Sequence, residues 1–139
     1  MEKNMVELFA GVGGFRVGLE RLDSGWKTSW FSQWEPGKRK QWAHDCYVYH
    51  FGDVKDLAGE YTTGIDISEV DKKNIPNHTL LTGGFPCQDY SVAHSLSSSK
   101  GIEGKKGVLW WQIRDILIAK RPPFVLLENV DRLLKSPAP

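Results

Sequence analysis

The chain has 139 residues, of which 40% are hydrophobic and 25% charged, and its formal net charge is +1. This composition predicts a globular protein of one domain or part of one, and excludes a strongly basic nucleic-acid-binding module. No apolar stretch is long enough to span a membrane. Two cysteines and four histidines form neither a disulfide framework nor a zinc-type spacing, so we expect no metal and a reduced, cytoplasmic compartment.

Two strands and two helices are predicted in the first half of the chain. An apolar run over residues 5–9 predicts a strand that leads into a glycine-rich turn, and a helix follows with Phe15, Leu19 and Leu22 on one face. Residues 28–34 alternate and carry aromatic side chains, which predicts a second strand. Helical spacing then predicts a second helix through Trp42, Ala43, Cys46, Tyr47 and His50.

Three further strands and one helix are predicted in the second half. Residues 53–77 are polar, and a short strand ending near Asp66 is the one element expected there. Residues 79–82 predict a buried strand that ends in two glycines. An amphipathic helix over 108–119 and a fully apolar strand over 124–127 follow.

Strands that alternate with helices predict an α/β fold with a mostly parallel sheet. In such sheets ligands bind beyond the carboxyl ends of the strands. The chemically suggestive residues are expected at this edge, and they are Gly11, Trp34, Glu35, Asp66, Cys87 and Glu128.

The glycine-rich turn after the first strand has two interpretations. Gly11, Gly13 and Gly14 allow a ligand to approach the backbone closely and expose amide groups at the start of a helix. Arg16 stands where the dinucleotide-binding fingerprint has its third glycine. Taken alone, the pattern therefore fits a simple tight turn as well as it fits a nucleotide-type site.

The end of the second predicted strand favours the nucleotide-type site. Glu35 lies about 20 positions beyond the glycines, where an acidic residue would hold a ribose hydroxyl. Trp34 offers a flat face for an adenine ring. The alternative is a core tryptophan beside a solvated glutamate.

Two further residues suggest catalysis. Cys87 follows glycines and a proline at the end of an apolar strand, where a constrained turn can expose a thiolate; the alternative is a small core residue. Glu128 ends an apolar strand, which suits a general acid if the carboxyl has partners; the alternative is a solvated residue. Cys46 lies on an apolar helix face and is expected to be structural.

Three motifs in this order resemble those of the bacterial DNA cytosine C5-methyltransferases. Residues 7–16 (ELFAGVGGFR) are similar to the first motif of that family, with Glu7 where Asp is usual. Residues 83–88 (GGFPCQ) are similar to the catalytic Pro-Cys-Gln motif, and residues 128–130 to the Glu-Asn-Val motif. The resemblance covers almost the whole chain. It implies a Rossmann-like S-adenosylmethionine-dependent methyltransferase fold, with helices on both faces of the sheet and incomplete at the C-terminal end.

The resemblance also implies how S-adenosylmethionine, and its product S-adenosylhomocysteine, would bind. Gln33-Trp34-Glu35 departs from the commoner Glu-Trp-Asp, so the ribose contact falls to either Glu35 or Gln33. The cofactor-binding residues that it implies are Phe9, Gly11, Gly13, Gly14, Trp34, Glu35, Asp66, Ile67, Pro86 and Leu109.

For catalysis, the resemblance implies that Cys87 attacks C6 of a cytosine flipped out of double-stranded DNA. Glu128 would meet N3 of that base. Residues 91–106, rich in Ser, Gly and Lys, predict a mobile loop. The resemblance implies that the segment from Gln88 to Lys106 closes over the flipped base. The residues expected near the DNA are Gln88, Ser91 and Asn129.

The resemblance further implies that residues 1–139 are the N-terminal cofactor-binding and catalytic portion of such an enzyme, without its target-recognition region. We therefore expect a second segment or chain as partner, no membrane, and weak or no activity from this chain alone. Two alternatives stay open: a non-catalytic cofactor-binding or interaction fragment, and an RNA cytosine C5-methyltransferase. A nicotinamide-binding domain fits less well, because Arg16 interrupts its fingerprint and Cys87 would have no purpose.

Overall fold

The computed structural model describes residues 1–84 and 108–129, which form a layered α/β fold. The elements in chain order are β1 (Asn4–Leu8), α1 (Gly14–Glu20), β2 (Lys27–Ser32), α2 (Trp42–Phe51), a 3-10 helix (Ile67–Glu69), β3 (Leu80–Gly83), α3 (Val108–Lys120) and β4 (Phe124–Leu127). Four of the five strands predicted from the sequence and all three predicted α-helices are thereby confirmed. The loop predicted over 91–106 lies outside the described residues.

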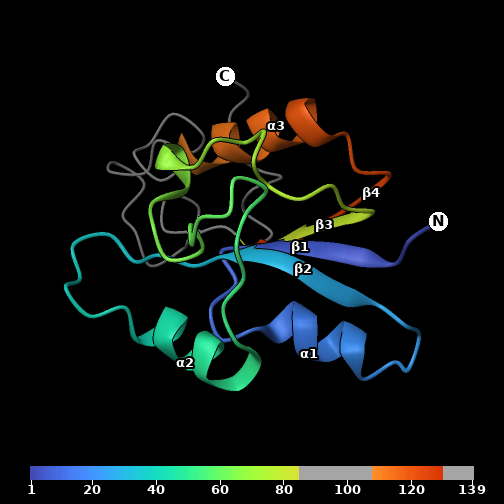
Figure 1. The fold of residues 1–139 in the computed structure, drawn as a ribbon, viewed down its shortest axis with the longest axis horizontal. Coiled ribbons are helices and arrows are strands. Elements are labelled where there is room, and N and C mark those ends of the chain that lie inside the picture. The colour runs from blue at the N-terminus through green and yellow to red at the C-terminus, as the bar shows by residue number, and fades with distance from the viewer. Residues whose placement is uncertain (85–107, 130–139) are drawn as a thin grey trace.

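The four strands form one parallel sheet in the order β2-β1-β3-β4. The register is level at the carboxyl ends: Leu8 pairs with both Ser32 and Gly83, and Gly83 pairs with Leu127. Helices α1 and α2 cover one face of the sheet and α3 the other, as Figure 1 shows. The segments that follow the four strands therefore leave the sheet along the same edge.

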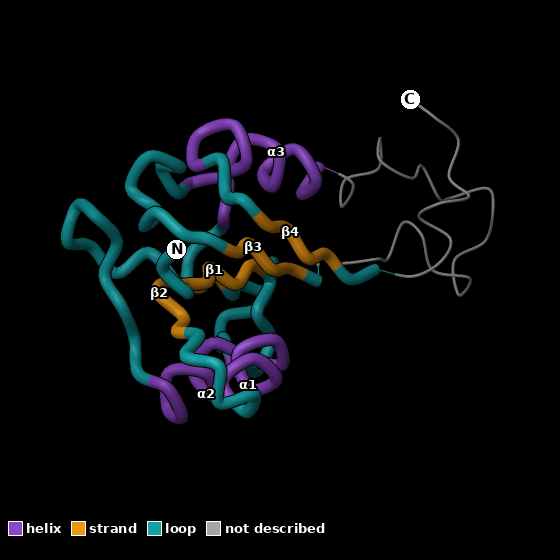
Figure 2. Tube along the Cα trace, turned by 90° about the vertical axis from the view of Figure 1, so that its right-hand side faces the viewer, coloured by secondary structure: helices purple, strands orange, loops and turns teal. Residues whose placement is uncertain are grey.

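Hydrophobic side chains bury both faces of the sheet. In β1 the alternation of a strand sends Val6 and Leu8 to one face and the side chain between them to the other. The main core fills the α3 side and contains Val6, Leu8, Trp30, Ile67, Val70, Ile75, Leu81, Ile113 and Ile116. A smaller core contains Ala10, Phe31 and Tyr47. Tyr47 belongs to α2, which lies with α1 below the sheet in Figure 2.

Some expectations for the helices and the long connection are wrong. Residues 53–77 are all described and contain no strand; they bury apolar side chains from an irregular segment whose one helical turn is Ile67–Glu69. Helix α1 ends before Leu22, which is exposed. In α2 the buried side centres on Tyr47, with Phe51 beside it, whereas Trp42 is exposed because the helix faces the sheet one residue out of the expected phase.

Strand β4 is apolar, as predicted, but its side chains are not buried. Phe124, Val125 and Leu126 are exposed, and β4 is the last strand in the sheet order. None of the helices within residues 1–84 and 108–129 is long and apolar enough to cross a lipid bilayer. Within the same ranges, no group of three or more His, Cys, Asp or Glu side chains is placed to hold a metal ion.

Two isoleucines of α3 distinguish the stability that comes from burial in the core from the stability of the helix itself. Ile116 is completely buried in the main core, so Ile116→Ala should lower the free energy of unfolding by about 2–5 kcal/mol, measured by urea denaturation. Ile118 is 64% exposed in the same helix, so Ile118→Ala should cost less than about 1 kcal/mol. Equal losses for the two variants would contradict this placement of α3.

Candidate active site

The glycine turn leaves β1 through an unusual backbone conformation. Phe9, Gly11 and Gly13 all have positive φ angles, of 51°, 56° and 95°. Such angles suit glycine, whereas a phenylalanine there is strained and held by its surroundings. The Ala10 N–H donates to the Ser32 carbonyl (3.0 Å), which anchors the turn on β2. A Cβ atom at Gly11 would meet nothing within 4 Å, so this part of the turn is open to a ligand.

Gln33 connects the end of β2 to this turn. Its side-chain oxygen accepts a hydrogen bond from the Gly11 N–H at 2.7 Å, and its backbone N–H donates to the Thr63 carbonyl at 2.9 Å. From the sequence, Gln33 is named only as one of two candidates for the ribose contact. The structure adds that the same side chain holds the glycine turn in place.

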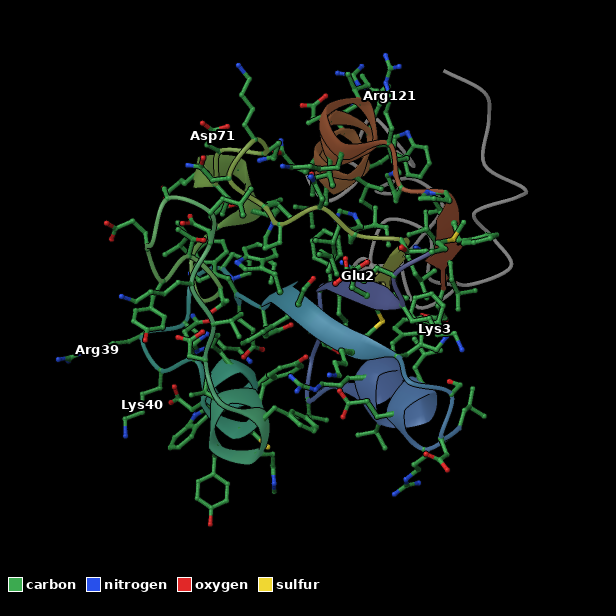
Figure 3. The ribbon with its side chains drawn as sticks, turned by 45° about the vertical axis from the view of Figure 1, so that its right-hand side comes forward. Glu2, Lys3, Arg39, Lys40, Asp71 and Arg121 are labelled. Atoms are coloured by element: carbon green, nitrogen blue, oxygen red, sulfur yellow. The ribbon has the colours of Figure 1, made fainter. Side chains whose placement is uncertain are left out.

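The two residues after Gln33 lie at the surface. Trp34 is 38% exposed. Glu35 accepts from the Lys38 ammonium at 2.9 Å, and its N–H donates to the Gln41 side-chain oxygen at 2.7 Å. The cations that follow, Arg39 and Lys40, point outward from this segment (Figure 3). Glu35 is thus half-buried, with its carboxylate paired to a cation of the segment that follows β2.

Glu7 is the main feature that the sequence-based prediction did not interpret. It is completely buried on the side of the sheet that α1 and α2 cover. Its carboxylate accepts from the Phe15 N–H and from the Tyr47 hydroxyl, both at 3.1 Å. The signal was visible as one charged residue inside the apolar run of residues 4–8 (NMVEL), because a charge is rarely buried there without partners.

The burial of Glu7 changes the acidity of this carboxyl. Desolvation raises its pKa above the usual 4.5, and the hydrogen bonds from Tyr47, Arg16 and Phe15 and the charge of Arg16 offset part of that rise. Tyr47 responds to the same environment: its burial and the neighbouring Glu7 raise the pKa of its hydroxyl. The tyrosine therefore stays a hydrogen-bond donor at every physiological pH.

Three of the expected cofactor contacts lie at or next to the main core, on the α3 side of the sheet. The Asp66 carboxylate accepts from the Ser68 N–H at 2.9 Å and caps the 3-10 helix. The Ile67 side chain is buried in the main core, and Leu109 packs against that core at the start of α3. Asp66 does not follow a strand, in contrast to the prediction.

Glu128 lies beside the segment that leads to Cys87. Its N–H donates to the Gly83 carbonyl at 2.9 Å, and a Cβ atom on Gly84 would be 3.2 Å from its Oε2. The carboxylate is exposed, as in the alternative interpretation of a residue just past the strand. Asn129 next to it is half-buried. The remaining expected site residues, Pro86, Cys87, Gln88 and Ser91, lie outside the described residues.

The fold and the arrangement of strand ends define a Rossmann-like α/β domain. The chain is similar to a solved methyltransferase of Entamoeba histolytica, EhMeth, with a TM-score of 0.69 and 21% identity over 98% of this chain and 40% of that one. It is also similar to the Dnmt2 methyltransferase of S. pombe, with a TM-score of 0.63 and 19% identity over 96% of this chain and 38% of that one. At these identities the likeness establishes the fold.

Sequence comparison identifies the family within that fold. The sequence model of the C-5 cytosine-specific DNA methylases matches residues 3–138, and the chain belongs to this family. It is 50% identical to the Type II methyltransferase M.Sau3AI of Staphylococcus aureus over 96% of this chain and 32% of that protein. For M.HaeII of Haemophilus aegyptius the identity is 37%, over 95% and 36%. The chain thus spans about a third of the length of the curated relatives that it matches.

The acidity of Glu7 makes the stability of the protein depend on pH. The unfolded carboxyl ionises near 4.5, whereas the buried one keeps its proton to higher pH. The folded state therefore binds more protons above about pH 4.5, and the protein should lose stability relative to Glu7→Gln as the pH rises from there. Urea denaturation across that range measures the difference. Exposed Glu2→Gln should show no such trend, and parallel curves for native protein and Glu7→Gln would refute the effect.

Proposed function

We propose that this chain is the cofactor-binding and nucleophile-bearing part of a DNA cytosine C5-methyltransferase that uses S-adenosylmethionine. The observation that carries the proposal is the level carboxyl edge of the sheet. There the glycine turn follows β1, Gln33-Trp34-Glu35 follows β2, the glycines before Cys87 follow β3, and Glu128 follows β4. Each segment on its own is weak support, but four on one edge fit a single reaction centre.

The glycine turn suits a cofactor without phosphates. In dinucleotide-binding folds, free amides at the start of the helix after the first strand receive a pyrophosphate. Here the Phe15 amide already donates to the buried Glu7 side chain, so this amide is not available to a phosphate. S-adenosylmethionine carries a sulfonium, an ammonium and a single carboxylate in place of phosphates. This supports it over a nicotinamide dinucleotide.

The residues proposed to hold the cofactor divide among the strand ends. Phe9, Gly11, Gly13 and Gly14 would receive the methionine end, and Trp34 would stack on adenine. Either Gln33 or Glu35 would meet the ribose. Gln33 already uses its oxygen on the Gly11 N–H, and Glu35 is paired with Lys38, so each offers only part of its polar group. Asp66, Ile67, Pro86 and Leu109 would complete the set.

The chemistry follows from the weak nucleophilicity of cytosine C5. Cys87, as thiolate, would add to C6 and form a covalent bond, while Glu128 would hydrogen-bond or protonate N3 and stabilise the charge that develops. When bound, S-adenosylmethionine supplies the methyl group that C5 accepts. Loss of the C5 proton then allows elimination of Cys87 and restores the aromatic ring. The position of Glu128 beside Gly84, three residues before Cys87, supports this pairing.

The substrate would be double-stranded DNA with the target cytosine flipped out, since C6 is inaccessible within the stack. Gln88, Ser91 and Asn129 would contact the DNA around that base. The outward cations Arg39 and Lys40 add positive charge to the same chain. Further polypeptide would supply target recognition, and the exposed apolar side chains of β4 at the sheet edge support its docking there.

Cofactor binding can be tested on the chain itself by calorimetric titration with S-adenosylmethionine. Loss of adenine stacking in Trp34→Ala should weaken binding on the order of tenfold or more. Trp42→Ala is the matched control, because Trp42 is 65% exposed in α2 and its ring meets only Lys40 among the described ring contacts. A folded chain that binds no cofactor, or equal losses for both variants, would reject the assigned pocket.

Methyl transfer requires the chain to be joined to the part of M.Sau3AI that the match does not cover. We expect this chimera to transfer labelled methyl groups from S-adenosylmethionine to duplex DNA. Cys87→Ala should lower the rate by about a thousandfold or more, as expected for a nucleophile. Cys46→Ala is the control, because Cys46 lies half-buried in α2. Full activity of Cys87→Ala would exclude the mechanism, and methylation of RNA in preference to DNA would exclude the substrate.

A further inference from the structure

Tyr47 of α2 lies against the glycine turn at Gly13. It is completely buried in the smaller core, where its ring stacks on Phe31 with centroids 3.8 Å apart and an interplanar angle of 19°. The ring of Phe51, one helical turn later, is tilted against it at 4.9 Å. These contacts hold the tyrosine ring in one orientation, with its hydroxyl directed at Glu7.

The same aromatic pair supports the turn at Gly13. A Cβ atom at Gly13 would be 2.7 Å from Phe51 Cε2 and 3.2 Å from Tyr47 Cε2, so both rings lie directly against the glycine backbone. Beyond the turn, the Arg16 guanidinium lies 4.4 Å from the Phe51 ring centroid and 5.7 Å from that of Tyr47. The α2 rings therefore contact both the glycine turn, at Gly13, and the first turn of α1, at Arg16.

Glu7 carries the effect of the tyrosine hydroxyl to the turn. One carboxylate oxygen accepts from Tyr47 and the other from the Phe15 N–H. A buried carboxylate with one partner removed is free to rotate or to protonate, and either change loosens its bond to the other partner. The hydroxyl thus fixes the carboxylate, which in turn fixes the backbone between Gly13 and Phe15.

We propose that Tyr47 is a positioning residue that acts through Glu7 and sets the affinity of the glycine turn for S-adenosylmethionine. The identity of the ligand rests on the proposed function, whereas the positioning of the turn does not. A backbone that is already held in its binding conformation loses less entropy when the ligand arrives. Tyr47 belongs to neither the expected cofactor contacts nor the catalytic residues.

The test is Tyr47→Phe, which removes the hydroxyl and keeps the stacked ring. Loss of this hydrogen bond should raise the dissociation constant for S-adenosylmethionine about fivefold in calorimetric titration. Tyr49→Phe is the matched control: Tyr49 lies in the same helix, is 85% exposed and should bind as the unmodified chain does. Equal affinity of Tyr47→Phe and Tyr49→Phe would overturn the proposal.

A double-mutant cycle with Glu7→Gln separates positioning from a general loss of stability. If Tyr47 acts through Glu7, the double variant should bind S-adenosylmethionine about as weakly as whichever single variant has the lower affinity. Losses of affinity that simply add would show that the two side chains act independently and would contradict the proposal. Thermal unfolding of each variant verifies that the compared proteins are folded.

Amide hydrogen exchange tests the positioning without any cofactor. Tyr47→Phe should speed the exchange of the Phe15 amide about fivefold and leave the β3 amides unchanged. Faster exchange in a chain that binds no S-adenosylmethionine would reject the proposed function and retain the positioning. Unchanged exchange at Phe15 would reject the positioning even in a chain that binds the cofactor tightly.

Discussion

The site depends on one buried carboxylate. Glu7 joins β1 to α1 through the Phe15 amide and to α2 through the Tyr47 hydroxyl, so three elements meet at a single side chain. Burying the charge is unfavourable, and only the full set of partners makes it acceptable. The start of α1 and the aromatic face of α2 are consequently constrained together, and the glycine turn takes its shape from both.

A second constraint is the register of the sheet. Because β1, β3 and β4 pair with their carboxyl ends level, segments that are far apart in the chain emerge next to one another. The hydrogen bond from the Glu128 N–H to the Gly83 carbonyl is the direct result, since it joins the end of β4 to the end of β3. In this architecture a reaction centre is assembled from short segments, each a few residues long, and the rigid sheet sets their spacing.

Sequence patterns predicted those parts of the fold that local periodicity determines. The limits of β4 and the course of α3 followed from apolar runs and helical spacing. Residues 53–77 did not, because their buried side chains come from irregular backbone that has no period. The same distinction between local pattern and tertiary structure applies to the candidate site. Glycines at a strand end were readable, whereas the bonds from Gln33 to Gly11 and from Tyr47 to Glu7 span 22 and 40 positions and depend on tertiary structure.

The exposed β4 has a practical consequence for the isolated chain. Among the described residues, β4 is the last strand of the parallel sheet, and the side chains of Phe124, Val125 and Leu126 lie at the surface. An exposed edge strand of this kind can serve as a template for another strand. None of these four positions, Phe124 to Leu127, carries a charge or a proline that would discourage such pairing. The described surface of β4 therefore carries the features that favour association along a sheet edge.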